Sequence, residues 1–231
     1  MRPGAIDING TAKMNDFRLY DHPLSLREID EVSRGLMLHY PLRDNSIDKV
    51  IYDCSGFGHN GVVQGSVVAK SDTNRNSYSM YEDDGRYNYI KSQNMIFPSD
   101  KITMSCWIKG NEAGYTNYHI PLSFNSSHYE LSLEGGSGLL RGGFVISGTR
   151  QCITTSGPTI DGQWHLITIT YDGQTIRRYV DGKEYASTAA VGTLTGGTGS
   201  LLIGNYNGTQ YGNKGMYTSD VRIYATALTA G

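Results

Sequence analysis

The alternation of hydrophobic and polar positions from residue 36 onward is that of many short strands. Residues 102–108 and 164–171 place apolar side chains at every second position, which is the period of a half-buried strand. The second run ends at Asp172-Gly173, and the next run, 175–180, ends at Asp181-Gly182. Asp-Gly between two such runs is a strong short-range signal for a hairpin. Further strands are predicted at 36–40, 61–69, 77–81, 86–91, 119–124, 129–134, 142–147, 185–190, 200–204 and 215–224.

One short segment before this region has the pattern of a helix. Ser25 and Glu28 form a capping box, in which the serine hydroxyl accepts from a backbone N–H and the glutamate reaches back to the N-cap. Gly35 supplies a C-terminal stop. We therefore predict one short helix over residues 25–34. Its half-apolar stripe consists of Leu26, Ile29 and Val32.

Many short strands without intervening helices predict an all-β fold, and we expect a two-sheet antiparallel jelly-roll sandwich. A chain of 231 residues suits one sandwich of this kind. Its 29 glycines agree with many turns, and its 17 tyrosines against 5 phenylalanines favour aromatic side chains that face water at one edge.

An internal repeat divides the chain. Residues 15–20 (NDFRLY) are echoed by residues 219–224 (SDVRIY), and each copy is followed after a short spacer by Leu-Ser or Leu-Thr. We interpret each copy as the last strand of a domain, so that the first copy belongs to a preceding domain. Residues 1–35 are then a remnant strand with a linker helix, and residues 36–231 are the sandwich.

The two copies compete for one place in that sandwich. We expect residues 217–224 to fill the edge position of the last strand, because their own domain lies directly upstream. The strand at 13–20 should then fray or pair at another edge.

The charge and the cysteines exclude several function classes. The net charge is −2 and no lysine/arginine stripe is present, which argues against a nucleic-acid partner. No apolar run is long enough for membrane insertion, and residues 1–11 lack the apolar centre of a secretory signal. The three cysteines form no CxxC pair, so neither a disulfide framework nor a zinc site is expected.

Several motifs together resemble the laminin-G-like domains of the concanavalin A-like lectin/glucanase superfamily. They lie in the same order as in that family, and with the closing Ala227-Leu228 the resemblance covers residues 37 to 228. They are residues 53–61 (DCSGFGHNG), 87–90 (YNYI), 161–165 (DGQWH), 170–173 (TYDG), 179–183 (YVDGK) and 220–224 (DVRIY).

The resemblance implies a jelly roll, no required cofactor, and in some relatives a structural calcium near the early loop and the last strand. Carboxylates are the ligands that calcium prefers, and the candidates in those stretches are Asp44, Asp53 and Asp220. The alternative is that each aspartate caps a turn or pairs with an arginine. Residues 33–40 further resemble linkers in tandem modules of phage structural proteins, such as tail or adhesion proteins. That likeness implies a virion or cell-surface location after cytosolic synthesis.

Candidate catalytic groups are few. Residues 28–31 (EIDE) are similar to the paired carboxylates of β-glucanases, and retaining hydrolysis needs two carboxyl groups about 5 Å apart on the face that meets substrate. These residues lie on the predicted helix outside the sandwich, and Val32 and Ser33 stand where a further glutamate is required. No nucleophile–base pair is recognisable elsewhere. The sequence therefore argues against an enzyme.

Loop tyrosines beside amides favour a carbohydrate ligand. Aromatic rings stack on the C–H faces of sugars, and amide groups bond to their hydroxyls. The alternative for any one residue is a solvated turn. We predict a non-catalytic glycan-binding or adhesion module, with a cell-surface glycan and other domains or subunits of a parent assembly as partners. A purely structural spacer or assembly domain is the alternative, and a glycoside hydrolase is the least favoured. The candidate glycan-binding residues are Tyr115, Tyr118, Asn125, His128, Tyr206, Asn207, Tyr211 and Asn213.

Overall fold

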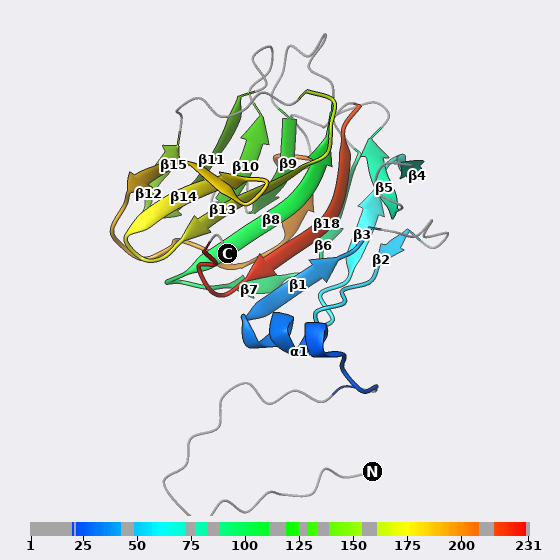
Figure 1. The fold of residues 1–231 in the computed structure, drawn as a ribbon, viewed down its shortest axis with the longest axis horizontal. Helices are drawn as coiled ribbons and strands as arrows, with labels where there is room; N and C mark the ends of the chain where they lie inside the picture. The colour runs from blue at the N-terminus through cyan, green and yellow to red at the C-terminus, as the bar shows by residue number, and fades with distance from the viewer. Residues whose placement is uncertain are drawn as a thin grey trace, which may run out of the picture.

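Two large antiparallel sheets lie face to face in the computed structural model (Figure 1). This architecture confirms the predicted jelly-roll sandwich with one short helix. The helix, α1, is too short and too polar to cross a bilayer. The structure describes residue 20 and residues 22–42, 49–72, 77–82, 88–110, 119–124, 129–133, 139–153, 161–207 and 215–229.

The first sheet, here called the β8 sheet, has the strand order β15-β14-β13-β8-β18-β5-β4, with β1 also paired to β18. Its strands are β1 (Leu36–Tyr40), β4 (Val67–Asp72), β5 (Ser77–Glu82), β8 (Ile102–Lys109), β13 (His165–Tyr171), β14 (Thr175–Val180), β15 (Lys183–Ala189) and β18 (Tyr217–Tyr224).

The second sheet, here called the β10 sheet, has the order β12-β11-β10-β9-β17-β6-β3-β2. A two-stranded sheet of β7 (Met95–Phe97) and β16 (Gly197–Gly199) accompanies it. The strands of the β10 sheet are β2 (Val50–Ile51), β3 (Gly61–Gln64), β6 (Tyr89–Ser92), β9 (His119–Phe124), β10 (Tyr129–Leu133), β11 (Leu140–Ile146), β12 (Thr149–Ile153) and β17 (Leu201–Ile203).

The core between the sheets contains a row of aromatic rings. Phe97 and Phe124 have ring centroids 3.7 Å apart, and Tyr129 lies 5.3 Å from both Phe124 and Phe144. Tyr171 of the β8 sheet continues the row, 6.1 Å from Phe144. Offset and edge-on arrangements of this kind are favoured by the ring quadrupole. The row joins the two sheets along their inner faces.

The Asp-Gly hairpin prediction is confirmed at β14–β15. Asp181 and Gly182 have φ of 51° and 78° between Val180 and Lys183, which pair with each other. Two consecutive positive φ values define the type I′ turn, whose twist matches that of the flanking strands. Asp172 and Gly173 lie in a longer, three-residue connection between β13 and β14. There the Asp172 carboxylate accepts from the N–H groups of Gln174 and Thr175.

Two sequence predictions about strands were wrong. Residues 61–69 form two strands rather than one, because Gly65 has a φ of 69° and turns the chain from β3 in one sheet to β4 in the other. Strand β18 occupies an interior position rather than the predicted edge (Figure 1, red). It lies between β8 on one side and β5 and β1 on the other. The predicted strand at 13–20 lies outside the described residues except for Tyr20.

Helix α1 (Leu26–Ser33) begins with the predicted capping box. The N–H of Glu28 donates to the Ser25 hydroxyl, and the N–H of Ser25 donates to the Glu28 carboxylate. The helix lies beside the start of β1, and Gly35, with a φ of 78°, reverses the chain into that strand. Local sequence therefore sets both ends of the helix.

A set of five side chains, here called the α1 clamp, holds α1 and β1 to β18. The Arg222 guanidinium donates to Glu31 at 2.6 Å and to Asp220 at 3.1 Å. The Tyr224 hydroxyl donates to the other Glu31 oxygen, and His39 Nε2 lies 2.8 Å from Asp220 Oδ1. The side chains of the four charged or titratable members are 14–19% exposed. Partly buried charges need such partners to offset their lost hydration.

A β-bulge places Asp220 in the clamp. The register between β18 and β8 shifts between Ser219 and Arg222, and Asp220 has a φ of 52°. Aspartate tolerates this left-handed conformation better than most residues. Burial opposes ionisation of Asp220, but the hydrogen bonds from His39 and Arg222 outweigh it, so the pKa of Asp220 lies below its ordinary value.

Removing the Glu31 charge should destabilise the fold. Glu31→Gln leaves Arg222 partly buried with one of its two carboxylate partners lost, and we expect the free energy of unfolding to fall by about 1–3 kcal/mol. Urea unfolding at pH 7 measures this. Arg27→Gln is the control, because its side chain is 71% exposed and lies 3.9 Å from Glu31. Equal effects of the two substitutions would contradict the clamp.

Asp220 should also make stability depend on pH. A carboxylate with a depressed folded pKa stabilises the fold fully above its unfolded pKa, about 3.9. That contribution is lost as the pH falls through the lower folded pKa. We therefore expect the difference in unfolding free energy between the protein and Asp220→Asn to shrink below about pH 4. Urea unfolding from pH 7 to pH 2 tests this, and a pH-independent difference would refute it.

Candidate functional site

The structure places two of the eight predicted glycan-binding residues. Tyr206 and Asn207 follow β17 and are half-buried. The others lie outside the described residues: Tyr115, Tyr118, Asn125, His128, Tyr211 and Asn213.

The described strands on either side of these segments show which segments begin and end at the same strand ends. In the β8 sheet, Lys109 at the end of β8 pairs with Tyr217 at the start of β18. In the β10 sheet, Ile203 at the end of β17 pairs with Leu122 of β9. The β8–β9 and β17–β18 connections therefore join the same neighbouring strand ends. The segment 125–128 instead joins Phe124 to Tyr129, at the opposite end of β9.

The turn at 205–207 is anchored to the outer side of β9. The Ser123 hydroxyl lies 2.6 Å from the carbonyl oxygen of Asn205 and 3.0 Å from that of Tyr206. The N–H of Asn207 donates to the Asn205 side chain at 3.0 Å, and Asn205 is fully buried. Because Leu122 and Phe124 point into the core, Ser123 faces away from it. The anchoring fixes Tyr206 and Asn207 beside the outer face of the β10 sheet.

That outer face carries an ion pair between a buried carboxylate and an exposed guanidinium. Glu130 is 5% exposed, and its carboxylate accepts from Arg150 and from the Ser132 hydroxyl, the latter at 3.3 Å. Arg150 lies on β12, and its Nε is 3.1 Å from Cys152 Sγ. Gly143 stands between Glu130 and Cys152 in the register. A Cβ at Gly143 would come within 2.6 Å of the Cys152 sulfur, so glycine keeps this crossing open.

Burial shifts the titration of two groups on the neighbouring strands β9 and β10. Burial raises the pKa of Glu130, although Arg150 and the Ser132 hydroxyl act in the opposite direction. Burial also lowers the pKa of His119, at the start of β9, to about 4. The Arg150 guanidinium is within electrostatic reach of Tyr206. Perturbed groups of this kind gather at functional sites more often than elsewhere.

The sequence analysis missed Glu130, Ser132 and Arg150. A signal was present, because residues 129–133 (YELSL) alternate apolar and polar side chains, so that Glu130 and Ser132 share the face opposite the core. A buried carboxylate on that face needs a cationic partner, but the sequence alone does not show that Arg150 supplies it.

The three calcium candidates separate in the structure. Asp53 is fully buried and accepts from the backbone N–H groups of His39, Ser55 and His59 at 2.9–3.0 Å. Asp220 is bound by His39 and Arg222 in the α1 clamp. These are the turn-capping and arginine-pairing roles that the sequence left open. Asp44 lies outside the described residues, and within the described ranges no three His, Cys, Asp or Glu side chains are grouped to hold a metal ion. Calcium binding stays a prediction.

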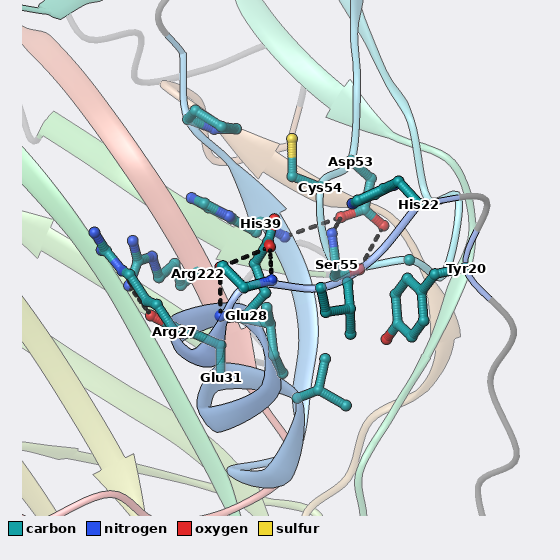
Figure 2. A pocket seen from close by; sticks show the side chains of 16 residues that line it. Tyr20, His22, Arg27, Glu28, Glu31, His39, Asp53, Cys54, Ser55 and Arg222 are labelled. Atoms are coloured by element: carbon teal, nitrogen blue, oxygen red, sulfur yellow. Dashed lines mark hydrogen bonds and ion pairs between the residues drawn. The ribbon is translucent and has the colours of Figure 1, made fainter.

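A pocket of about 710 Å³ lies between α1 and the loop before β3 (Figure 2). Figure 2 shows Tyr20 beside the loop on one side and Glu31 and Arg222 of the clamp on the other. The Tyr20 ring packs on Gly56, where a Cβ would come within 2.8 Å of it. The carboxylates that line the pocket are all engaged: Glu28 in the capping box, Glu31 in the clamp and Asp53 by backbone donors. This arrangement offers no free acid/base pair.

Solved structures share the fold at low sequence identity. The binding domain of Paraclostridial Mosquitocidal Protein 1 has a TM-score of 0.66 and 20% identity over 85% of this chain and 50% of that one. Botulinum neurotoxin type C, whose cell entry depends upon interaction with two ganglioside molecules, has a TM-score of 0.65 and 15% identity over 87% of this chain and 50% of that one. The chain thus spans about half the length of these two structures.

A third structure is matched over nearly its whole length. Domain 4 of AbnA, a GH43 extracellular arabinanase from Geobacillus stearothermophilus, was solved in complex with arabinotriose. It has a TM-score of 0.63 and 20% identity over 85% of this chain and 95% of that one. No curated protein matches the sequence. Residues 84–231, more than half of the chain, match a family described as concanavalin A-like lectin/glucanases. With this match and the two-sheet fold, the chain belongs to the concanavalin A-like lectin/glucanases superfamily, in its laminin G branch.

Proposed function

We propose that this domain is a non-catalytic carbohydrate-binding module whose ligand meets the outer face of the β10 sheet beside Tyr206. The observation that carries the proposal is the ion pair between the buried Glu130 and the exposed Arg150 on that face, next to the anchored turn at 205–207. Glu130 is buried on an interior strand, and stability gives no need for a charged group there, since apolar side chains of similar size serve as well. Positioned polar groups beside an aromatic ring are instead what a sugar requires.

The chemistry of the face suits sugar hydroxyls. A carboxylate accepts from adjacent hydroxyls, and a guanidinium donates to them. Asn207 adds an amide, and the Tyr206 ring offers a surface for the C–H face of a sugar ring. Because hydrogen bonds already orient Glu130, Arg150 and the 205–207 turn, little ordering is required when a ligand binds. The predicted loop residues outside the described chain are proposed to complete the site.

The arrangement of the carboxylates supports binding without turnover. Glycoside hydrolysis uses two carboxyl groups about 5–9.5 Å apart. On the outward positions of β9 to β12, as described, Glu130 is the one carboxylate, and it is paired with Arg150. A group held in such a pair is poorly placed to act as general acid or base.

The structural neighbours support a glycan as the ligand class. One is a toxin whose cell entry depends on gangliosides, and another is a domain solved with arabinotriose. We propose a cell-surface glycan as the partner and a multi-domain parent, of the phage-structural or cell-surface kind, at a virion or cell surface. The support for that parent is the likeness of residues 33–40 to linkers of tandem phage modules.

A glycan array with the intact chain tests the ligand class. We expect reproducible binding that falls about 5- to 30-fold in Tyr206→Ala and in Tyr118→Ala, because each removes a stacking surface of about 1–2 kcal/mol. Tyr185→Ala is the matched control, since Tyr185 is 43% exposed on β15 of the other sheet.

The same arrays, run once with calcium and once with a chelator, test for a bound metal ion. Loss of glycan binding in the presence of chelator supports a role for calcium. A blank array in both conditions refutes glycan binding and leaves the spacer hypothesis.

The charge of Glu130 should make glycan binding depend on pH. Burial raises the Glu130 pKa, so its protonation begins above the ordinary glutamate value of about 4.3. We expect affinity to fall as the pH is lowered through that range, because the charged acceptor is lost. Titration calorimetry of the best array ligand from pH 7.5 to pH 4.5 measures this.

Glu130→Gln should bind more weakly at pH 7 by about 10- to 100-fold and lose this pH dependence. Glu184→Gln, on the exposed strand β15, should behave like the unmodified protein. A thermal melt separates a binding defect from misfolding. If a correctly folded Glu130→Gln variant keeps full affinity, the outer face of the β10 sheet is not the site.

A further inference from the structure

The repeated sequence motif supplies three of the five side chains of the α1 clamp. In the copy at 219–224, the polar positions Asp220, Arg222 and Tyr224 make the clamp, while Val221 and Ile223 are fully buried in the core. The copy at 15–20 has the same three polar residues in the same places: Asp16, Arg18 and Tyr20. The repeat therefore preserves the clamping side chains as well as the strand pattern.

The spacing after the motif is also preserved. Leu24 and Ser25 follow Tyr20 at the same interval at which Leu228 and Thr229 follow Tyr224. Ser25 is the N-cap of α1, so the first copy leads directly into a clamped helix. A threonine at position 229 has the side chain that a second such N-cap needs. The unit that repeats is thus strand, spacer and helix N-cap together.

The side chains that would pair with the first copy of the motif are already bound to the second copy. Glu31 and His39 bind Arg222, Tyr224 and Asp220, and they precede those residues by 181–193 positions. Tyr20, the described end of the first copy, lies on Gly56 at the rim of the pocket and not on Glu31. A second helix carboxylate and a second strand histidine would satisfy Asp16, Arg18 and Tyr20, and a preceding sandwich with its own equivalents of α1 and β1 would supply both.

Helix α1 has an apolar side that its own sandwich leaves uncovered. Leu26 is 86% exposed and Ile29 is 50% exposed, and no residue of the helix is classed as buried. The helix is held by Glu31 through polar contacts instead. A stripe of this kind on a segment between two domains is typical of a surface that a neighbouring domain covers.

The path after β18 shows where a further unit would begin. The N–H of Ala225 donates to the Gly35 carbonyl, and the Thr226 hydroxyl donates to the Arg34 carbonyl, so this segment passes the C-terminal end of α1. The N–H of Leu228 then donates to the Thr103 hydroxyl. A helix that began at Thr229 would start beside the end of the sandwich that carries α1. Repetition of this geometry joins units head to tail.

We propose that α1 is an inter-domain docking helix, whose Leu26 and Ile29 seat on a preceding sandwich of the same fold that ends with residues 15–20. The partner is thus a second unit of this kind, joined in the same chain. The contact lies at the α1 end of the sandwich and is independent of the glycan site on the β10 sheet.

The two equivalent arginines give a matched test in the intact chain. Arg222→Gln should lower the melting temperature by several degrees, because it breaks the clamp. Arg18→Gln should leave the melting temperature unchanged, because its partners belong to another unit. Hydrogen exchange should show protected amides at 217–224 and fast exchange at 15–20. A stability loss in Arg18→Gln, or protection at 15–20, would place the first copy in this sandwich and overturn the proposal.

A second copy of the intact chain can supply the docking partner in trans. Within one chain, a short tether holds two domains at an effective concentration in the millimolar range, so a weak contact between them is sufficient. Between separate chains we therefore expect association only at several hundred micromolar. Sedimentation equilibrium should show concentration-dependent association of the unmodified chain. The double variant Leu26→Ser/Ile29→Ser should remain monomeric, while Val191→Ser, which alters a 79% exposed apolar residue elsewhere, should associate normally. A monomer at all concentrations, or association that survives the double variant, overturns the docking role of α1.

Discussion

The pairing of partly buried charges around Arg222 is the interaction on which the attachment of α1 and β1 to the sandwich depends. Arg222 lies on an interior strand and joins Glu31 of α1 to Asp220, which in turn binds His39 of β1. The backbone N–H of His39 then donates to Asp53 in the early loop. None of these groups could be removed from water alone without a large loss of hydration. One continuous set of contacts therefore positions a helix, two strands and a loop, and it also forms a wall of the pocket.

The same physical rule explains the outer face of the β10 sheet. Glu130 is almost fully buried there, and Arg150 reaches it past Cys152 because Gly143 has no side chain to block the path. The α1 clamp links distant elements, whereas the Glu130–Arg150 pair links strands of one sheet and stabilises no connection between layers. This difference is the reason to regard the first as structural and the second as a binding feature.

Strand β18 connects the α1 clamp with the strand ends from which the β17–β18 connection starts. It begins at Tyr217, beside Lys109 and the strand ends from which the β17–β18 connection arises, and it ends at Tyr224 on α1 (Figure 1). Docking at one end and ligand recognition toward the other are compatible with a module repeated along a chain.

Local features of the sequence determined the elements of this protein. The Ser25–Glu28 capping box, the Asp181-Gly182 turn and the alternation in residues 102–108 act over a few residues, so they could be recognised without a fold. The predicted sandwich followed from them, together with the family motifs. Tertiary structure decided the rest, because it depends on register and on contacts between distant residues. It placed β18 in the interior, divided residues 61–69 between two sheets, and brought Arg150 to Glu130 and Asp220 to His39 across 20 and 181 positions. A charge in a sequence shows that a partner is needed once it is buried, but only the packing of the sheets determines burial and selects the partner.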